Sequence, residues 1–393
     1  MPPRRVWDLY SNRVDEKDRA DVWTPINGYE WPVPVPKESD LNLIRIEMLN
    51  LGLEYAWLDV LYLRQVGGPG EDARAEEWKL DVPTIGAVYT DGSHMVCYLS
   101  GLGLPFTLKE GDLDSDRSWF RRAWTLQEVG QWREIAGDTP DGPMHAERKD
   151  GKYETELLTR FHKQLQSMQD MSYRVLGPLK SMQQWVSTNP VDKVAGLAFV
   201  MGSEKIPAYY ESQSLEDAWT ALVNSMDTLY RGQLFFSCPE PGNAGTKWRP
   251  SWEQLMMKPL PAYDFDPNVS VDRDEAEEED SVDEVCIEKG LVQGLAVVVE
   301  GGDRHGKLIV KDKSGIEHGF GITATHEYPI PEDTYTLILA HDWVTFSGRY
   351  YCIVGRSLLG KRFEKVSMLE LSEEEQCKLE DLHIAEVCRY ILI

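Results

Sequence analysis

Hydrophobic and polar positions divide the first part of the chain into short segments that alternate between helix and strand patterns. Apolar residues at helical spacing follow Asp40, which is suited to cap a helix, and Gly52 is suited to end it. Residues 55–63 are almost continuously apolar, so we expect a buried strand there. A helix and a strand at residues 95–99 come next. This order predicts an α/β fold with a parallel sheet.

The most distinctive pattern lies at residues 117–129, where aromatic and aliphatic residues alternate with arginine and glutamate. Helical spacing would place Phe120 and Trp124 on one face, with Glu128 one turn further along. We therefore expect one continuous helix through this stretch, with a carboxylate beside an indole.

Glu128 has two interpretations at this stage. A buried carboxylate beside arginines is often structural, and Arg121 or Arg122 could form an ion pair with it. A buried carboxylate can also be a reactive group whose pKa its surroundings have shifted. The sequence leaves both interpretations open.

The rest of the chain divides into three further segments. Apolar residues at helical spacing recur over residues 151–270, which predicts a helical extension behind a first domain at residues 1–150. Residues 271–285 are dominated by aspartate and glutamate, so we expect a solvated acidic linker. Residues 286–393 predict a β-rich C-terminal domain with a terminal helix that Ser372 caps. Its strands are expected at residues 290–300, 306–312, 334–340 and 349–355.

Composition and charge narrow the function classes. The chain has 393 residues, 42% of them hydrophobic, and a net charge of −25. Such an acidic chain repels phosphate backbones and anionic lipid surfaces, so no nucleic-acid partner and no membrane partner are expected. The six cysteines form no Cys-x-x-Cys pair, and no apolar run approaches the ~18 residues of a membrane span. We therefore expect a cytoplasmic protein with reduced cysteines.

Motifs for several common chemistries are missing. The sequence has no Gly-x-Ser-x-Gly elbow and no His-Glu-x-x-His motif, and its histidines fit no metal-site spacing, so no metal is expected. The glycine-rich residues 67–70 lack the Gly-Lys-Ser/Thr of a phosphate-binding loop and are predicted to form a turn. If the chain is an enzyme, a carboxylate carries its chemistry.

Two sequence blocks together resemble the fungal heterokaryon incompatibility (HET) domain. Residues 57–65 are similar to the family's Trp-Ile/Leu-Asp-x-Leu-Cys-Ile/Leu-x-Gln block, with Tyr62 in place of the cysteine. Residues 122–128 are similar to its Arg-x-Trp-Thr-Leu-Gln-Glu block. The resemblance covers roughly residues 40–255. The family's early Ser-His-x-Trp block has no counterpart, so we expect the N-terminal strand block to be truncated or divergent.

The resemblance implies a fold and a chemistry. HET domains are similar to TIR domains, in whose enzymes a glutamate four residues after a helix tryptophan serves NAD glycohydrolysis. Trp124 and Glu128 have that spacing, so the resemblance implies a parallel TIR-like fold with Glu128 as the catalytic residue. NAD would be the substrate, with no further cofactor. Trp124 and Trp57 would form an aromatic wall of the NAD site, and Asp59 would orient the ribose.

The resemblance also implies a role, with alternatives. HET proteins act in non-self recognition, with programmed cell death as the output. The second hypothesis is a catalytically inactive signalling module that self-associates as a homo-oligomer, with Glu128 in an ion pair. A third, a glycosidase-like hydrolase, needs a second carboxylate about 5–10 Å from Glu128. In each case an unknown protein partner would bind through the C-terminal domain.

Overall fold

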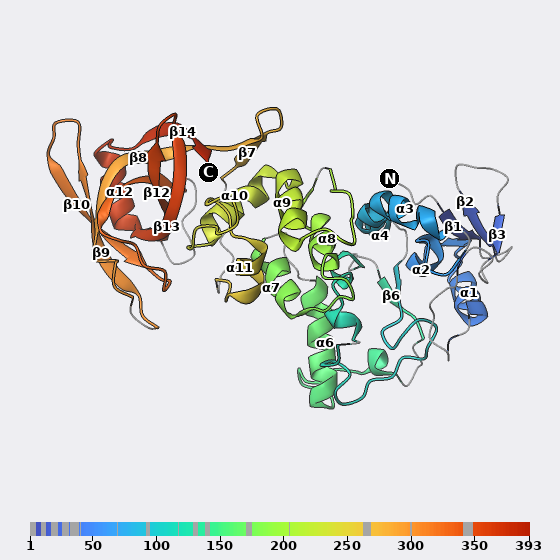
Figure 1. Ribbon diagram of the computed structural model, residues 1–393. Coiled ribbons are helices and arrows are strands. Elements are labelled where there is room, and N and C mark those ends of the chain that lie inside the picture. Colours follow the sequence, from blue (N-terminus) through green and yellow to red (C-terminus); the bar gives the residue numbers. More distant parts are fainter. Residues whose placement is uncertain are drawn as a thin grey trace. The chain divides into compact units, whose positions relative to one another are not determined.

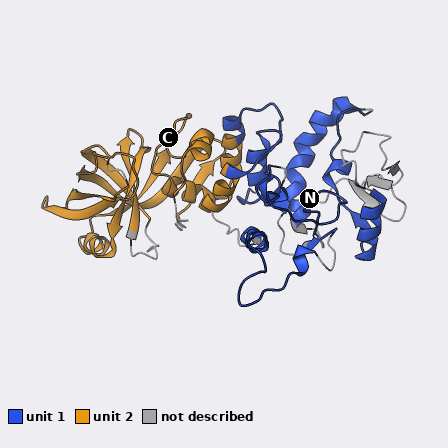
Figure 2. Cartoon of the chain, turned by 90° about the horizontal axis from the view of Figure 1, so that it is seen from below, with its two compact units in different colours: residues 1–172, 184–218 blue, residues 173–183, 219–393 orange. Residues whose placement is uncertain are grey.

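The computed structural model divides into two compact units (Figure 2). Unit 1 comprises residues 1–172 and 184–218, and unit 2 comprises residues 173–183 and 219–393. The division therefore falls within the predicted helical extension, which contributes residues to both units. The structure describes residues 5–8, 13–16, 23–25, 31, 39, 41–68, 70–91, 95–116, 118–128, 133–137, 142–169, 175–203, 205–261, 269–298, 301–340 and 349–393.

Unit 1 is built from short elements. Its strands are β1 (Arg5–Asp8), β2 (Arg13–Glu16), β3 (Trp23–Pro25), β4 (Tyr55–Ala56), β5 (Met95–Cys97) and β6 (Arg133–Ile135). Its α-helices are α1 (Leu41–Asn50), α2 (Asp59–Tyr62), α3 (Arg74–Asp81), α4 (Ile85–Asp91), α5 (Thr125–Glu128), α6 (Glu156–Gln169) and α8 (Asp192–Ala198). Its 3-10 helices are η1 (Glu71–Ala73), η2 (Val82–Thr84), η3 (Trp119–Arg121) and η4 (Pro143–His145).

The sheets of unit 1 differ from the predicted parallel sheet. The chain mixes helices and strands as expected, but β3, β2, β1 and β4 pair in that order and are all antiparallel. Among the residues described in unit 1, parallel pairing between strands is limited to β5 and β6. The predicted mixture of helices and strands is thus present, while parallel pairing is small and the four-stranded sheet is antiparallel.

The N-terminal segment forms strands despite its missing sequence block. β1 pairs with β4, with Trp7 opposite Ala56 and Asp8 opposite Tyr55. Strands therefore lie in the segment where the N-terminal block was expected to be truncated or divergent. α1 follows as predicted and ends at Asn50, two residues before Gly52, whose φ of 77° is a conformation that glycine adopts easily. The predicted cap Asp40 lies outside the described residues.

The predicted strand at residues 55–63 is cut short. β4 ends at Ala56, and α2 begins at Asp59. The backbone N–H of Val60 donates a hydrogen bond to the Asp59 carboxylate at 2.7 Å. Aspartate side chains compete with strand ladders in this way, so Asp59 turns the chain out of the sheet.

The predicted helix at residues 117–129 is broken in two. η3 ends at Arg121, and α5 begins at Thr125. Between them Arg122 is extended, with ψ 136°, and the neighbouring residue Ala123 donates its N–H to the Val186 carbonyl at 2.9 Å. Val186 in turn donates to the Arg121 carbonyl at 2.7 Å. Pairing with a segment distant in sequence therefore interrupts the predicted helix at residues 122–124.

Unit 2 combines helices with a large sheet. The helices of the C-terminal part are α7 (Leu176–Gln184), α9 (Leu215–Ser225), in which the division between the units falls, α10 (Thr228–Ser237), α11 (Trp252–Met257) and α12 (Glu373–Asp381). Its strands are β7 (Val271–Asp274), β8 (Glu279–Gln293), β9 (Arg304–Lys311), β10 (Glu317–Ala324), β11 (Asp333–Leu339), β12 (Arg349–Leu358), β13 (Arg362–Ser372) and β14 (Glu386–Leu392).

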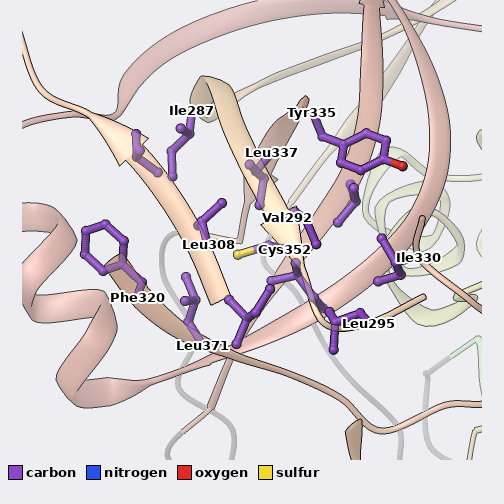
Figure 3. Close-up of a cluster of buried hydrophobic side chains, with 14 of the residues drawn as sticks. Ile287, Val292, Leu295, Leu308, Phe320, Ile330, Tyr335, Leu337, Cys352 and Leu371 are labelled. Atoms are coloured by element: carbon purple, nitrogen blue, oxygen red, sulfur yellow. The ribbon is translucent and has the colours of Figure 1, made fainter. Parts of the chain in front are cut away.

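The strands of unit 2 close into a ring (Figure 1). Each neighbouring pair in the cycle β8, β9, β10, β13, β12, β11 is antiparallel, and β11 pairs back to β8. Apolar side chains fill its interior, among them Leu308, Leu337 and Cys352, all completely buried (Figure 3). A β-rich C-terminal region was predicted, and β9, β11 and β12 lie at predicted positions. The strand predicted at residues 290–300 overlaps only the end of β8, which stops at Gln293, and β10, β13 and β14 were not predicted. Ser372 caps α12 by accepting the Glu375 N–H, as expected.

The predicted acidic linker is instead an antiparallel hairpin. β7 and the first residues of β8 pair from Val271 opposite Val282 to Asp274 opposite Glu279. Asp280 accepts from Arg231 of α10, a side chain that is 1% exposed, and from the Trp248 indole N–H at 3.0 Å. The prediction of a solvated linker is wrong because strand pairing orders the segment, while guanidinium groups compensate the Asp280 charge and the Trp248 indole donates a hydrogen bond to it.

Candidate functional site

Two cavities in unit 1 share part of their walls. One has a volume of about 760 Å³ and the other about 560 Å³. Both are lined by the same group of residues from α2, α4, α5 and the extended link before α5: Asp59, Val60, Tyr89, Arg122 and Glu128. The two HET-like blocks thus bring Asp59 and Glu128, far apart in the sequence, to one place.

Glu128 contacts a tryptophan that the sequence did not single out for this role. The Trp119 indole N–H donates to Oε2 of Glu128 at 2.7 Å. The break in the helix allows this contact, because Trp119 in η3 and Glu128 in α5 do not belong to one continuous helix. No sequence periodicity relates positions nine residues apart in this way, so Trp119 could not be predicted as the partner.

The surroundings of Glu128 shift its titration. Burial raises the pKa of Glu128, Arg122 lowers it, Asp59 raises it, and the Trp119 hydrogen bond lowers it. The carboxylate still contacts the cavity, since it lines both, but protein surrounds it closely. A carboxylate of this kind takes up protons more readily than one in water, which suits acid–base or charge-stabilising chemistry.

Asp59 resembles Glu128 in its environment. Burial raises the pKa of Asp59, while the hydrogen bond from Val60 and the charge of Arg122 lower it. Asp59 and Glu128 also influence each other, because the Asp59 charge contributes to the raised pKa of Glu128. The site therefore holds two coupled carboxyl groups at the junction of the cavities.

The predicted ion pair of Glu128 with an arginine is not formed among the described residues. Arg121 pairs with Asp116 at 3.1 Å and donates to the Asp114 carbonyl at 2.7 Å. Arg122 acts on Glu128 through its charge, without a salt bridge within 4.0 Å between the two described side chains. The hydrogen-bond partner of the Glu128 carboxylate is the Trp119 indole instead.

Trp124 and Trp57 lie differently from their predicted roles. Trp124 lines the smaller cavity and hydrogen-bonds the Asp192 carboxylate, which also accepts from the Tyr209 hydroxyl at 2.7 Å. Trp57 packs edge-on against Tyr89, with ring centroids 5.4 Å apart, and is not among the residues that line either cavity. The aromatic side chains that line the larger cavity near Glu128 are Trp119 and Tyr89, not Trp57 or Trp124.

The described ranges offer no metal centre and no membrane span. They contain no group of three or more histidine, cysteine, aspartate or glutamate side chains placed to hold a metal ion. None of the helices in those ranges is long and apolar enough to cross a bilayer.

Comparison with known proteins gives no further guide to the site. No protein-family model matches the chain, and no curated protein and no solved structure matches it either. Interpretation of the two cavities therefore depends on their own geometry and on the sequence blocks that form them.

Proposed function

We propose that the chain is a HET-domain protein of the fungal non-self recognition type, and that it hydrolyses the N-glycosidic bond of NAD at the junction of the two cavities. The observation that carries this proposal is the position of Glu128, which lines both cavities beside a second carboxyl group, Asp59. Pairs of carboxyl groups are the recurrent device for cleaving glycosidic bonds, since one can stabilise positive charge while the other handles a proton.

The chemistry needs little beyond a placed carboxylate. In NAD the nicotinamide nitrogen is cationic, so nicotinamide leaves as a neutral molecule with the electron pair of the C1′–N bond. The ribose that remains is an oxocarbenium-like cation, which the Glu128 carboxylate can stabilise by its charge. Water then forms a bond to C1′ and gives its proton to Asp59 or to solvent. ADP-ribose, nicotinamide and one proton are the products.

The titration of the site gives this reaction a pH dependence. Stabilising a cation requires the ionised form of Glu128, and burial raises the pKa of that carboxyl. Activity should therefore rise with pH and reach its plateau closer to neutrality than an ordinary glutamate would allow. The Arg122 charge limits the shift by lowering the pKa of Glu128.

A second candidate, a non-enzymatic signalling module, is favoured by the position of Trp124. The Trp124 side chain hydrogen-bonds the Asp192 carboxylate and not that of Glu128, which lies four residues later. Gln127, three residues after Trp124, donates its side-chain N–H to the Ala195 carbonyl at 2.9 Å. Part of the block thus serves packing against α8, as a structural motif would. In this case the protein self-associates and Glu128 is dispensable for signalling.

Nicotinamide release from NAD separates the two candidates. The full chain is incubated with NAD at high protein concentration beside Glu128→Gln and, as a matched control, Glu147→Gln, which changes an exposed glutamate. We expect release by the wild type and the control, and a loss of about 100-fold or more for Glu128→Gln. Equal release from all three would exclude Glu128 as the catalytic carboxylate. No release from any of them would leave the signalling module.

A further inference from the structure

Arg122 occupies the wall that the two cavities share. It is exposed, and it lies in the extended link between η3 and α5. Its carbonyl accepts the Thr125 N–H at 3.1 Å, and its backbone bridges to Val186 in parallel fashion. The backbone of Arg122 is thus held from both sides, and the residue lines both cavities.

Arg122 forms no ion pair with any carboxylate of the described residues. It is close enough to lower the pKa of both Glu128 and Asp59, yet within the described residues no carboxylate oxygen lies within 4.0 Å of it. Arg74, another arginine of the smaller cavity, differs in this respect. Its guanidinium forms two hydrogen bonds with Glu211, at 2.7 and 2.8 Å, and stacks on Trp78.

We infer that Arg122 binds the phosphates of a dinucleotide whose two nucleoside halves occupy the two cavities. A guanidinium fork matches phosphate oxygens in pairs, and arginine is the preferred residue for this contact. A pyrophosphate lies between two nucleosides in the same way that Arg122 lies between two cavities. In a chain of net charge −25, a cation at this point is needed to hold an anionic ligand beside two carboxyl groups.

This inference rests on the proposed function for its reaction and adds to it the residue that binds the substrate's phosphates. It predicts that the site distinguishes NAD from nicotinamide riboside, which has the same scissile bond and no phosphate. Substitution of Arg122 should weaken the use of NAD while leaving the use of the riboside almost unchanged. A residue that only tuned the carboxyl groups would affect both substrates alike.

The experiment compares kcat/KM for the two substrates in the wild type, Arg122→Gln, Arg122→Lys and the exposed-charge control Lys149→Gln. Rates are taken on the pH plateau of each variant, because loss of the Arg122 charge would raise the pKa of Glu128, Asp59 and their neighbours. We expect Arg122→Gln to lower kcat/KM for NAD by about 10- to 100-fold. Arg122→Lys, which keeps the charge without the fork, should fall between.

The outcomes separate this inference from the proposed function. If Arg122→Gln slows the cleavage of both substrates equally, or of neither, Arg122 does not contact the phosphates. The proposed reaction would still stand in that case if Glu128→Gln abolishes nicotinamide release. A selective loss with NAD supports the inference, provided that Lys149→Gln behaves as wild type.

A binding measurement covers the case in which no variant cleaves NAD. Isothermal titration with ADP-ribose, which keeps the pyrophosphate, then tests Arg122 without any reaction. Weaker binding by Arg122→Gln than by the wild type and Lys149→Gln would support a dinucleotide site without catalysis. No binding by the wild type, or equal binding by all three, would overturn the inference.

Discussion

At the scale of single residues, Glu128 occupies a position that favours chemistry over stability. Burial is the largest influence on its titration, and it raises the pKa of the carboxyl above its ordinary value. At a pH between the ordinary pKa of glutamate in the unfolded chain and the raised pKa of Glu128 in the folded protein, the folded protein binds more protons than the unfolded chain. The contribution of Glu128 to stability is therefore complete at acid pH and is lost as pH rises through its folded-state pKa.

Glu128→Gln should for this reason stabilise the protein at neutral pH. The amide does not titrate, and its carbonyl can still accept the Trp119 N–H. We expect a gain of about 1 kcal/mol in the free energy of unfolding at pH 7–8, which diminishes toward pH 4, where the wild-type carboxyl is protonated. Urea unfolding across this pH range measures the difference, with Glu147→Gln as the control. A less stable Glu128→Gln at neutral pH would mean that the carboxylate supports the fold as an ion pair.

The residues of the site could be predicted only in part. Asp59 and Glu128 were identified by their place in two sequence blocks, and the structure brings them to the same cavity walls. Trp119 was not predicted as the partner of Glu128, because its contact depends on a break in the helix that local periodicity does not encode. Trp57 was predicted to line the site but packs edge-on against Tyr89 and lines neither cavity. A sequence pattern does not show which of two neighbouring rings contacts a cavity.

At the scale of elements, the predictions fail where a distant segment decides the backbone. Residues 117–129 have a helical pattern, yet hydrogen bonds with Val186 break the helix at Arg122. Residues 271–285 have the composition of a linker, yet Arg231 and Trp248 draw them into a hairpin. β9, β11 and β12 of the C-terminal ring could be predicted because their apolar patterns are local. β10 and β13 of the same ring were not predicted.

The hairpin supports a prediction at this scale. Asp280→Asn should leave the Arg231 charge buried without its carboxylate partner and weaken the contacts to Arg273 and Trp248. Removing one member of a buried ion pair costs about 3–5 kcal/mol, so we expect unfolding at markedly lower urea concentration. Tryptophan fluorescence reports the transition, since Trp248 is completely buried.

Asp283→Asn is the matched control, because Asp283 lies on the same strand and is exposed. It should change the free energy of unfolding by less than about 0.5 kcal/mol. Similar stability of the two variants would show that Asp280 is as solvated as a linker residue, and that the pairing with Arg231 contributes little.

At the scale of the whole molecule, the net charge of −25 opposes contact between copies of the chain. The repulsion acts over a Debye length of about 10 Å at 0.1 M salt and about 3 Å at 1 M. A signalling module that works by self-association must overcome this repulsion through apolar or specific polar contacts. Salt therefore separates the two candidate functions, since an enzyme of this charge needs no second copy.

If the chain is a signalling module, its self-association should strengthen as salt increases from about 0.05 M to 0.5 M, because screening removes repulsion while apolar contacts persist. Sedimentation velocity over a range of protein concentrations measures the species at each salt. Glu128→Gln should associate like the wild type, since this candidate assigns the carboxylate no role in assembly. A monomer at every concentration and salt would contradict the module, and association that weakens with salt would point to contacts between opposite charges.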